Sequence, residues 1–426
     1  MSAFHAQYAW IDGTVAHDVR LDVAGGRFTA VTAGVPAGDA TRLPGLVLPG
    51  LANAHSHAFH RALRGRTQTG RGSFWTWRDR MYALAGTLDP DRYLALARAV
   101  YGEMALAGIT CVGEFHYLHH GPGGVPYAEP NAMGQAVIEG ARQAGIRITL
   151  LDTLYLTSTV DGAPLEGVQR RFGDRNADAW RTRVAALRPA AHMRPGAAVH
   201  SVRAVPVPVL NRLPGDGPMH VHLSEQRAEN EQCLAVHGCT PTELLHRHGV
   251  LGPRTTAVHA THLTDDDIKT LGATGTGVCL CPTTERDLAD GIGPARALAD
   301  AGSPLSLGSD SHAVIDLFEE ARAVELDERL ATQRRGWFTV ADLLGAATNH
   351  AALGWDDAGA LTAGHRADLV AVALDSVRTA GVDPAEAVFA ATATDVTHVI
   401  ADGRTVVADG RHTGFDVAAA LREVLS

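Results

Sequence analysis

The chain has little of what would stabilise a small secreted domain or anchor a protein in a membrane. Its five cysteines are an odd number without a repeating spacing, which indicates reduced thiols rather than a disulfide framework. No apolar run reaches transmembrane length, and the N-terminal segment lacks the basic and apolar regions of a secretory signal. We therefore expect a cytoplasmic protein with no membrane partner.

Positive charge is also in deficit. Lys and Arg together number 37 against 47 Asp and Glu, and the formal charge of −10 argues against nucleic acid as a partner. The chain has a single lysine, Lys269, so all the other positively charged side chains counted here are arginines. An anionic substrate would therefore have to be bound by locally placed arginines.

Short β-like runs occupy both ends of the chain. The first fifty residues alternate apolar and polar positions between the turn signals Asp12-Gly13 and Gly25-Gly26. The C-terminal part repeats this pattern in segments such as HRADLVAVALDS and THVIADGRTVVADGRH. We predict that residues 1–50 and 356–426 pair into one small composite β-sandwich domain.

The middle of the chain, residues 51–355, alternates strand-like runs with helical segments. Strand candidates include GITCVGEFHY, IRITLLDTLY, PMHVHLSE and SPLSLGSDSH, and the stretch from Asp89-Pro90 to Gly108 has helix start and stop signals. About eight such strands in about 300 residues predict an α/β fold, a (β/α)8 TIM-like barrel. An open doubly wound sheet is the alternative, although no glycine-rich dinucleotide fingerprint or P-loop follows the first strand.

Polar side chains stand at the ends of four predicted strands. In chain order they are His55 and His57, then His220, His222 and Glu225, then His259 and His262, and finally Asp310 and His312. The C-terminal ends of barrel strands meet at one mouth, and imidazoles with a carboxylate suit a catalytic divalent ion that keeps a position open for water. We predict that one ion is held by His55, His57, His222 and Asp310.

Ordinary structural roles compete with these assignments. An H-x-H pair can arise by chance in a chain with 22 histidines, and Glu225 can be an acid favoured in the first turn of a helix. His222 is preferred to His220 as a ligand because its i+3 relation to Glu225 lets that carboxylate reach a substrate beside the metal. His220 is therefore interpreted as a packed or supporting residue rather than a ligand.

The remaining candidates receive no catalytic role. His262 is interpreted as packed or supporting, and His312 is left unassigned. Cys279 and Cys281 form C-x-C rather than the C-x-x-C of many zinc sites, so we interpret them as strand residues.

The motifs together resemble the amidohydrolase superfamily, specifically its mononuclear deaminase branch. The resemblance rests on H-x-H after the first strand, H-x-x-E after the fifth, VHATHL after the sixth and GSDS after the eighth. It implies one divalent metal ion, zinc or alternatively iron(II), and a homodimer. Binuclear relatives bridge two metals with a carbamylated lysine on strand four, whereas Lys269 follows strand six, so a carbamate-bridged pair is not expected.

The same resemblance implies the catalytic roles. Asp310 would act as a metal ligand and as the base that takes a proton from water. Glu225 would protonate the nitrogen of a C=N group under attack, and His259 would orient and support the hydroxide. Ammonia would then leave from a tetrahedral intermediate.

Three further segments, GSFWTWRDRMY, GEFHYLHH and AVHSVRAV, resemble the bacterial formimidoylglutamate deiminases of histidine degradation. Their substrate carries two carboxylates, which the planar guanidinium of arginine binds in a bidentate manner. The resemblance implies substrate contacts from residues at five positions, namely His60, Arg78, Tyr117, His200 and Arg203. His60 is a departure, since the family usually has glutamine there, and a related formimidoyl or guanidino acid is therefore an alternative substrate.

Two other functions remain open. A mononuclear deaminase could act on an aromatic heterocycle such as guanine, cytosine or an adenosine derivative, but a flat base does not require two arginines. A non-enzymatic barrel that serves as an assembly scaffold is the second alternative, and the intact set of metal ligands argues against it.

Overall fold

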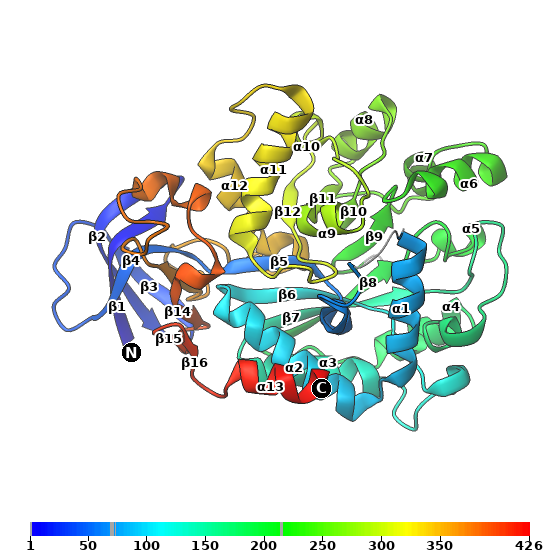
Figure 1. Cartoon of the computed structure of the whole chain (residues 1–426), viewed down its shortest axis with the longest axis horizontal. Helices are drawn as coiled ribbons and strands as arrows, with labels where there is room; N and C mark the ends of the chain where they lie inside the picture. Colours follow the sequence, from blue (N-terminus) through cyan, green and yellow to red (C-terminus); the bar gives the residue numbers. More distant parts are fainter. Residues whose placement is uncertain (1, 69–71, 73, 214–215) are drawn as a thin grey trace.

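The barrel predicted from the sequence is present. The computed structural model describes residues 2–68, 72, 74–213 and 216–426. Eight parallel strands form one sheet in sequential order (Figure 1): β5 (Leu51–Ser56), β6 (Ile109–His116), β7 (Arg147–Leu154), β8 (Met193–Val199), β9 (Met219–Leu223), β10 (Thr255–His259), β11 (Gly277–Leu280) and β12 (Leu305–Leu307). A parallel bridge between Ser56 and Asp310 brings the first and last strands together, so the barrel is nearly closed.

Helices surround these strands. They are α1 (Phe74–Thr87), α2 (Pro90–Leu106), α3 (Ala132–Ala144), α4 (Ala177–Ala185), α5 (Val207–Leu210), α6 (Arg227–His237), α7 (Pro241–Arg247), α8 (Asp265–Ala273), α9 (Pro282–Asp287), α10 (Ala295–Asp300), α11 (Leu317–Thr332) and α12 (Val340–Ala347). Short 3-10 turns are η1 (Ala58–Leu63), η2 (Pro122–Gly124), η3 (Gly167–Arg171), η4 (His350–Leu353), η5 (Pro384–Phe389) and η6 (Ala393–Asp395). No helix within the described ranges is long and apolar enough to cross a membrane.

Helix α2 begins and ends where the sequence predicts. The Asp89 side chain accepts a hydrogen bond from the backbone N–H of Arg92, and Pro90 occupies the first turn. The helix ends before Gly108, whose φ of +89° favours glycine. Strand β6 then starts at Ile109, so the local signals place this strand correctly in the barrel wall.

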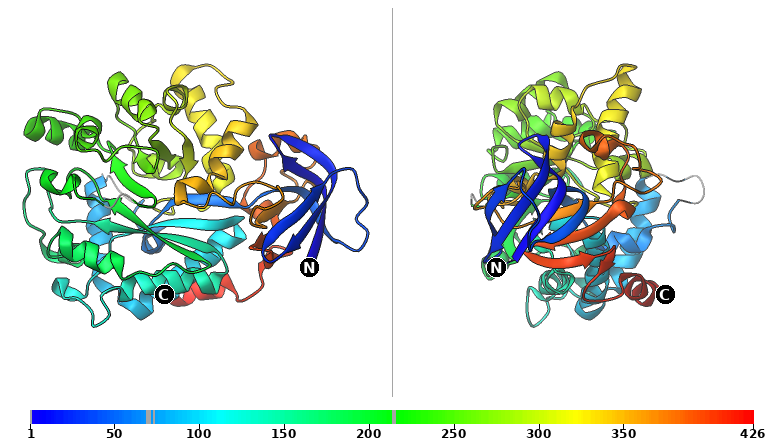
Figure 2. Two further views of the ribbon diagram at one scale, coloured as in Figure 1. Left: turned by 180° about the vertical axis from the view of Figure 1, so that it is seen from behind. Right: turned by 90° about the vertical axis from the view of Figure 1, so that its left-hand side faces the viewer.

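The two ends of the chain pair into one separate sheet, as predicted. Its order is β16-β15-β14-β13-β4-β1-β2-β3, from the strands β1 (Ser2–Ile11), β2 (Thr14–Ala24), β3 (Arg27–Thr32), β4 (Thr41–Pro49), β13 (Leu369–Val372), β14 (Val396–Ala401), β15 (Arg404–Ala408) and β16 (Arg411–His412). Figure 2 shows this sheet at one end of the barrel. The N-terminal strand β4 pairs antiparallel with the C-terminal strand β13, and this pairing joins the two ends.

Glycine and a buried ion pair fix the junction between sheet and barrel. Only Gly50 separates β4 from β5, and a Cβ there would lie 2.5 Å from Thr110 Oγ1. Arg147, at the start of β7, forms a bidentate ion pair with Asp368, just before β13, and the two side chains are 1% and 0% exposed. Beyond the sheet, helix α13 (Val417–Leu425) packs against α2.

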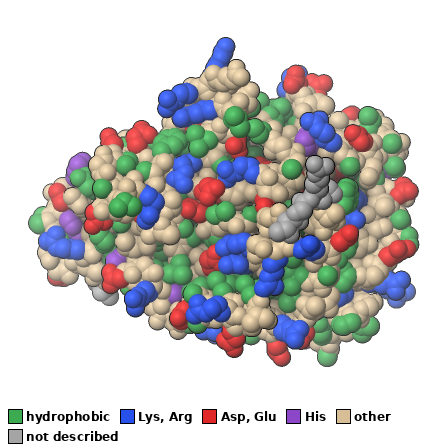
Figure 3. All heavy atoms as spheres, in the orientation of Figure 1, with side chains coloured by type: hydrophobic (Ala, Val, Ile, Leu, Met, Phe, Trp, Pro, Cys, Tyr) green, Lys and Arg blue, Asp and Glu red, His purple; other side chains and the backbone are tan. Residues whose placement is uncertain are grey.

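The surface carries mixed charge. On the face shown in Figure 3, basic and acidic side chains are interspersed with apolar ones. The single lysine, Lys269, lies on α8 with its side chain 73% exposed and 2.9 Å from Asp266. It is therefore a surface residue and not part of the barrel interior.

Candidate functional site

Side chains from four strand ends converge at the C-terminal mouth of the barrel. His55 belongs to β5 and His57 follows it directly, while His222 lies on β9 and His259 ends β10. Asp310 comes just after β12. All five are buried, because parallel strands in a barrel bring their C-terminal ends around one central point.

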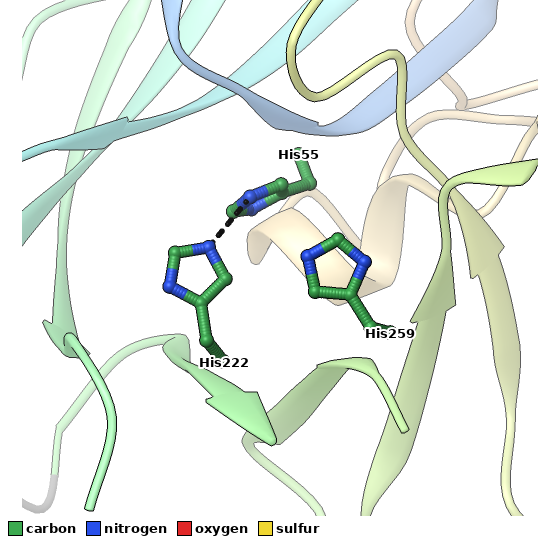
Figure 4. Close-up of side chains that lie close together, drawn as sticks. All are labelled: His55, His222 and His259. Carbon is green, nitrogen blue, oxygen red and sulfur yellow. Dashed lines mark hydrogen bonds between the residues drawn. The ribbon is translucent and has the colours of Figure 1, made fainter. Parts of the chain in front are cut away.

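The predicted metal ligands fall into two overlapping groups. The donor atoms of His55, His57 and Asp310 lie within 4.8 Å of one another, and those of His55 and His222 form a second such group together with His259. His222 Nε2 is 3.1 Å from His55 Nε2 (Figure 4), and Asp310 Oδ1 is 3.4 Å from both His55 Nε2 and His57 Nε2. Two ligands each about 2.1 Å from an ion and separated by 3.1 Å subtend an angle of about 95°, which lies between octahedral and tetrahedral values. Each group is therefore compact enough for one divalent cation, and His55 belongs to both.

The hydrogen bonds of the imidazoles orient them for this role. Nδ1 of His57 donates to the Phe115 carbonyl at 2.9 Å, and Nδ1 of His222 donates to the His200 carbonyl at 3.0 Å. These bonds leave the Nε2 lone pairs facing the cluster. Burial lowers the pKa of His55 to about 3 and also lowers the pKa values of His57 and His222, so all three are neutral near pH 7 and can coordinate a metal.

Strained backbone accompanies these side chains. Ser224, His259 and Asp310, which follow or end β9, β10 and β12, have φ values of +52°, +69° and +41°. Left-handed conformations cost non-glycine residues about 1–3 kcal/mol each and persist only where neighbouring structure enforces them. At Asp310, hydrogen bonds of 3.0 Å to the His55 carbonyl and 3.2 Å from the His57 N–H provide that enforcement.

His259 lies among three carboxylates. Its Nε2 is 3.8 Å from Asp310 Oδ2 and 3.9 Å from Glu225 Oε1, and its Nδ1 is 3.3 Å from Glu285 Oε1. Burial disfavours the charged imidazole, but these carboxylates outweigh burial and raise the pKa of His259 well above its usual range. A cationic His259 can therefore stabilise negative charge between Glu225 and Asp310.

Glu225 has the properties of a proton donor. Burial raises the pKa of its carboxyl group, and the negative charge of Asp310 raises it further, although His259 opposes both effects. The side chain keeps 17% of its surface exposed and lines the cavity at the mouth of the barrel. It can therefore hold a proton and deliver it to a group bound there.

The cavity has a volume of about 870 Å³, including space open to solvent. The predicted metal ligands His57, His222 and Asp310 lie on its wall with Glu225 and His259. The structure also brings all five predicted substrate contacts, His60, Arg78, Tyr117, His200 and Arg203, to this cavity. His55 is the one site residue from the sequence that does not line it.

Two guanidinium groups in this cavity lack a carboxylate partner. Arg78 stacks over Trp75, 4.5 Å from the ring centre, and Arg203 Nη1 donates to the Tyr155 hydroxyl at 2.9 Å. Across the described residues, no Asp or Glu lies within ion-pair distance of either group. Both arginines are therefore available to an anionic ligand.

The other predicted contacts form a polar and aromatic wall. His60 Nε2 is 2.8 Å from the Tyr117 hydroxyl, so the histidine at position 60 forms a hydrogen bond with another residue of the cavity wall. His200 packs edge-on against both His222 and Tyr155. These contacts hold the side chains of the wall in place before any ligand arrives.

Besides His55, three strand-end histidines lie outside the cavity. His220 Nε2 is bonded to the Ala352 carbonyl at 3.0 Å, and His262 contributes its backbone N–H to the Ser224 carbonyl. His312 lies between Ser56 Oγ and Ser309 Oγ at 3.1 and 3.0 Å. All three make structural contacts, and His312 supports the contact between the first and last strands.

Glu285 and Cys281 were not predicted as site residues. Cys281 follows β11 and precedes α9, and Glu285 lies on the first turn of that helix. The sequence signal was present in CPTTE, because Pro282 starts a helix directly after strand seven and thereby places Glu285 beside the mouth. The interpretation of Cys279 as a strand residue is confirmed, whereas Cys281 lies just beyond the strand.

Comparisons with known proteins agree with this geometry. The model of the amidohydrolase family matches residues 46–406. A formimidoylglutamate deiminase of Pseudomonas aeruginosa is 35% identical over 98% of this chain and 97% of its own length, and an 8-oxoguanine deaminase of the same organism is 31% identical over 88% and 85%. The crystal structure of an amidohydrolase from Brucella melitensis is 33% identical, covers 100% of this chain and 99% of its own, and has a TM-score of 0.90.

Proposed function

We propose that this chain, which belongs to the amidohydrolase family and is a hydrolase acting on C–N bonds, releases ammonia from N-formimidoyl-L-glutamate and leaves N-formyl-L-glutamate. The observation that carries the proposal is the pair of guanidinium groups, Arg78 and Arg203, in the same cavity as Glu225 and the metal-ligand cluster. Two carboxylates on a short chain match two cationic groups, while a formimidoyl group needs a proton donor beside a metal. The 35% identical deiminase supports this choice.

The metal is part of the proposal. His55, His57, His222 and Asp310 would hold one divalent ion, zinc or alternatively iron(II), because three neutral imidazoles and a carboxylate suit both. When bound, such an ion supplies Lewis acidity that lowers the pKa of water from 15.7 to about 7.

The protein groups would then perform the proton transfers. Asp310 accepts a proton from the attacking water, and cationic His259 stabilises the negative charge that develops beside it. Glu225 donates its proton to the imino nitrogen, and the proton held by Asp310 then passes to the resulting amino group, so that the C–N bond breaks with ammonia as the leaving group. The hydroxyl proton of the tetrahedral intermediate returns to Glu225 as the carbonyl forms. The balance is one water consumed, with the imine nitrogen replaced by a carbonyl oxygen.

Arg203 and Arg78 would position the two carboxylates of the substrate. Arg203 has only Nη1 engaged in hydrogen bonds within the described ranges, which leaves Nε and Nη2 for a bidentate contact. His60, Tyr117 and His200 would border the chain between the carboxylates and the formimidoyl group. This arrangement fixes the reacting carbon near the metal and Glu225.

A heterocycle deaminase is the second candidate. Aromatic side chains, including Trp77, Tyr155 and Phe172, line the cavity and could stack on a flat base, and the 8-oxoguanine deaminase is a relative at 31% identity. Such a substrate would leave both arginines without a carboxylate partner, which is why the dicarboxylate is preferred.

The test is ammonia release by purified protein loaded with Zn²⁺ or Fe²⁺. We expect turnover of N-formimidoyl-L-glutamate and much slower turnover of guanine, 8-oxoguanine, cytosine and adenosine. No reaction with the former would overturn the substrate assignment, and a protein without bound metal and without any activity would favour a scaffold.

A homodimer in the cytoplasm, acting in histidine degradation, is also proposed from the resemblance. Light scattering of the purified protein tests the oligomeric state. Cell fractionation and growth on histidine as nitrogen source test the location and the pathway.

A further inference from the structure

The mouth of the barrel contains a second group of possible metal ligands beside the first. One imidazole nitrogen of His259, the Sγ of Cys281 and a carboxylate oxygen of Asp310 all lie within 4.8 Å of one another. Each of the three side chains is buried. Two ligands of one tetrahedral ion are about 3.5 Å apart, so small side-chain shifts suffice for a shared cation.

The two oxygens of Asp310 face different neighbours. Oδ1 is 3.4 Å from His55 and from His57, whereas Oδ2 is 3.8 Å from His259. A carboxylate in this orientation can serve one ion on its Oδ1 side and another on its Oδ2 side. The second group therefore does not compete for the imidazoles of His55, His57 and His222.

Glu285 holds the other two donors in place. Its Oε1 accepts a hydrogen bond from the backbone N–H of Cys281 at 2.9 Å and lies 3.3 Å from Nδ1 of His259. The contact with Nδ1 leaves Nε2 of His259 directed away from Glu285, which is the arrangement that supporting carboxylates give to metal-binding histidines.

Glycine provides the space around the sulfur. A Cβ at Gly308, next to β12, would lie 3.0 Å from Cys281 Sγ and 2.7 Å from His55 Cβ. Any larger residue at this position would press on both groups of donors. The close approach of β12 to the end of β11 is thus what places the thiol beside Asp310.

We propose that His259, Cys281 and Asp310 form a second site, for a thiophilic divalent cation such as Cd²⁺ or a second Zn²⁺, and that its occupancy stops turnover. On binding such an ion, the Cys281 thiol and the cationic imidazole of His259 each release a proton to solvent, because only the thiolate and the neutral imidazole have a lone pair for the metal. Soft thiolate ligands favour these metals over Mg²⁺ and Ca²⁺. Inhibition rests on the proposed function, because the ion would occupy the two residues assigned to the attacking water. Binding itself does not depend on the substrate.

The experiment titrates Cd²⁺ into protein that already holds one equivalent of Zn²⁺. Elemental analysis gives the stoichiometry of both metals, and ultraviolet absorption reports thiolate-to-metal charge transfer. The variants are Cys281→Ala and the nearly isosteric Cys281→Ser. The matched control is Cys279→Ala, which removes the buried thiol two residues earlier on β11.

We expect wild type and Cys279→Ala to bind one Cd²⁺ in addition to zinc, with a charge-transfer band, and both Cys281 variants to lose the band. The Cd²⁺ concentration that halves the rate should rise at least about tenfold in the Cys281 variants. A band that persists without Cys281, or the absence of a second ion in wild type, would overturn the site. If the ion binds through Cys281 but ammonia release continues, the site stands and the role assigned to His259 and Asp310 fails.

Discussion

Replacing Arg203 tests the substrate assignment most directly. In the structure its Nη1 donates to the Tyr155 hydroxyl at 2.9 Å and to the Ser158 carbonyl at 3.4 Å. Glu229 in the same cavity attracts the guanidinium electrostatically, but no carboxylate of the described residues lies within ion-pair distance of it. A substrate carboxylate about 4 Å away would interact with this charge by about 4 kcal/mol at an effective dielectric constant of about 20. Truncation of one partner of such a pair typically costs about 2–5 kcal/mol.

We therefore expect Arg203→Met to lower kcat/KM by about 30- to 5,000-fold, mainly through KM, because Arg203 holds a part of the substrate that does not react. The assay is steady-state ammonia release from N-formimidoyl-L-glutamate. The control variant is Arg142→Met, which removes an arginine that is 57% exposed on α3 and should leave the kinetics unchanged.

Substrate analogues make the test specific. In two analogues, one or the other carboxylate is replaced by a carboxamide. One of the two analogues lacks the carboxylate that Arg203 binds. Wild type and Arg203→Met should turn over this analogue at similar rates, because the charge pair is already lost in both cases. An unchanged KM of Arg203→Met for the parent substrate would refute the reasoning. If Arg203→Met loses the same activity relative to wild type on both analogues, the effect comes from folding and not from the loss of one charge pair.

Four further outcomes are expected. Glu225→Gln should lower kcat at least about 100-fold while elemental analysis shows that the metal is retained, and loss of metal would indicate a ligand role instead. Burial raises the pKa of Glu225, so its protonated form is present below that raised pKa and is lost as pH rises through it. The kcat should therefore decline on the alkaline side of the pH profile, and the residual rate of Glu225→Gln should lack this decline. Asp368→Asn should reduce the free energy of unfolding by about 3–5 kcal/mol in urea titrations, because it leaves the buried Arg147 charge without its main partner. A smaller loss would show that Asp402, 3.1 Å from Arg147, compensates. Removal of the metal by a chelator should abolish ammonia release and lower Tm. Added Zn²⁺ at about 100 times its Kd should restore about 2.7 kcal/mol of stability. An unchanged Tm after chelation would contradict a metal bound to the native state.

Local sequence signals were sufficient for most of the fold. Asp89-Pro90 and Gly108 bound a helix whose capping bond and positive φ are visible in the structure, and Asp12-Gly13 and Gly25-Gly26 mark hairpin turns. These features depend on neighbouring residues, so a linear pattern is enough to predict them. The joining of both chain ends in one sheet was also predicted, although the sequence did not show that β4 and β13 would be the strands that pair.

The sequence by itself determined which residue types stand at the strand ends, and thereby the convergence of His55, His57, His222, His259 and Asp310. Only the tertiary structure decided what surrounds them. Glu285 contacts both His259 and Cys281, Arg147 meets Asp368 more than two hundred residues away, and the oxygens of Asp310 face two different sets of imidazoles. The physical reason is that spacing along a strand fixes the direction of a side chain, whereas its partners come from other strands whose distance and register depend on the nearly closed barrel.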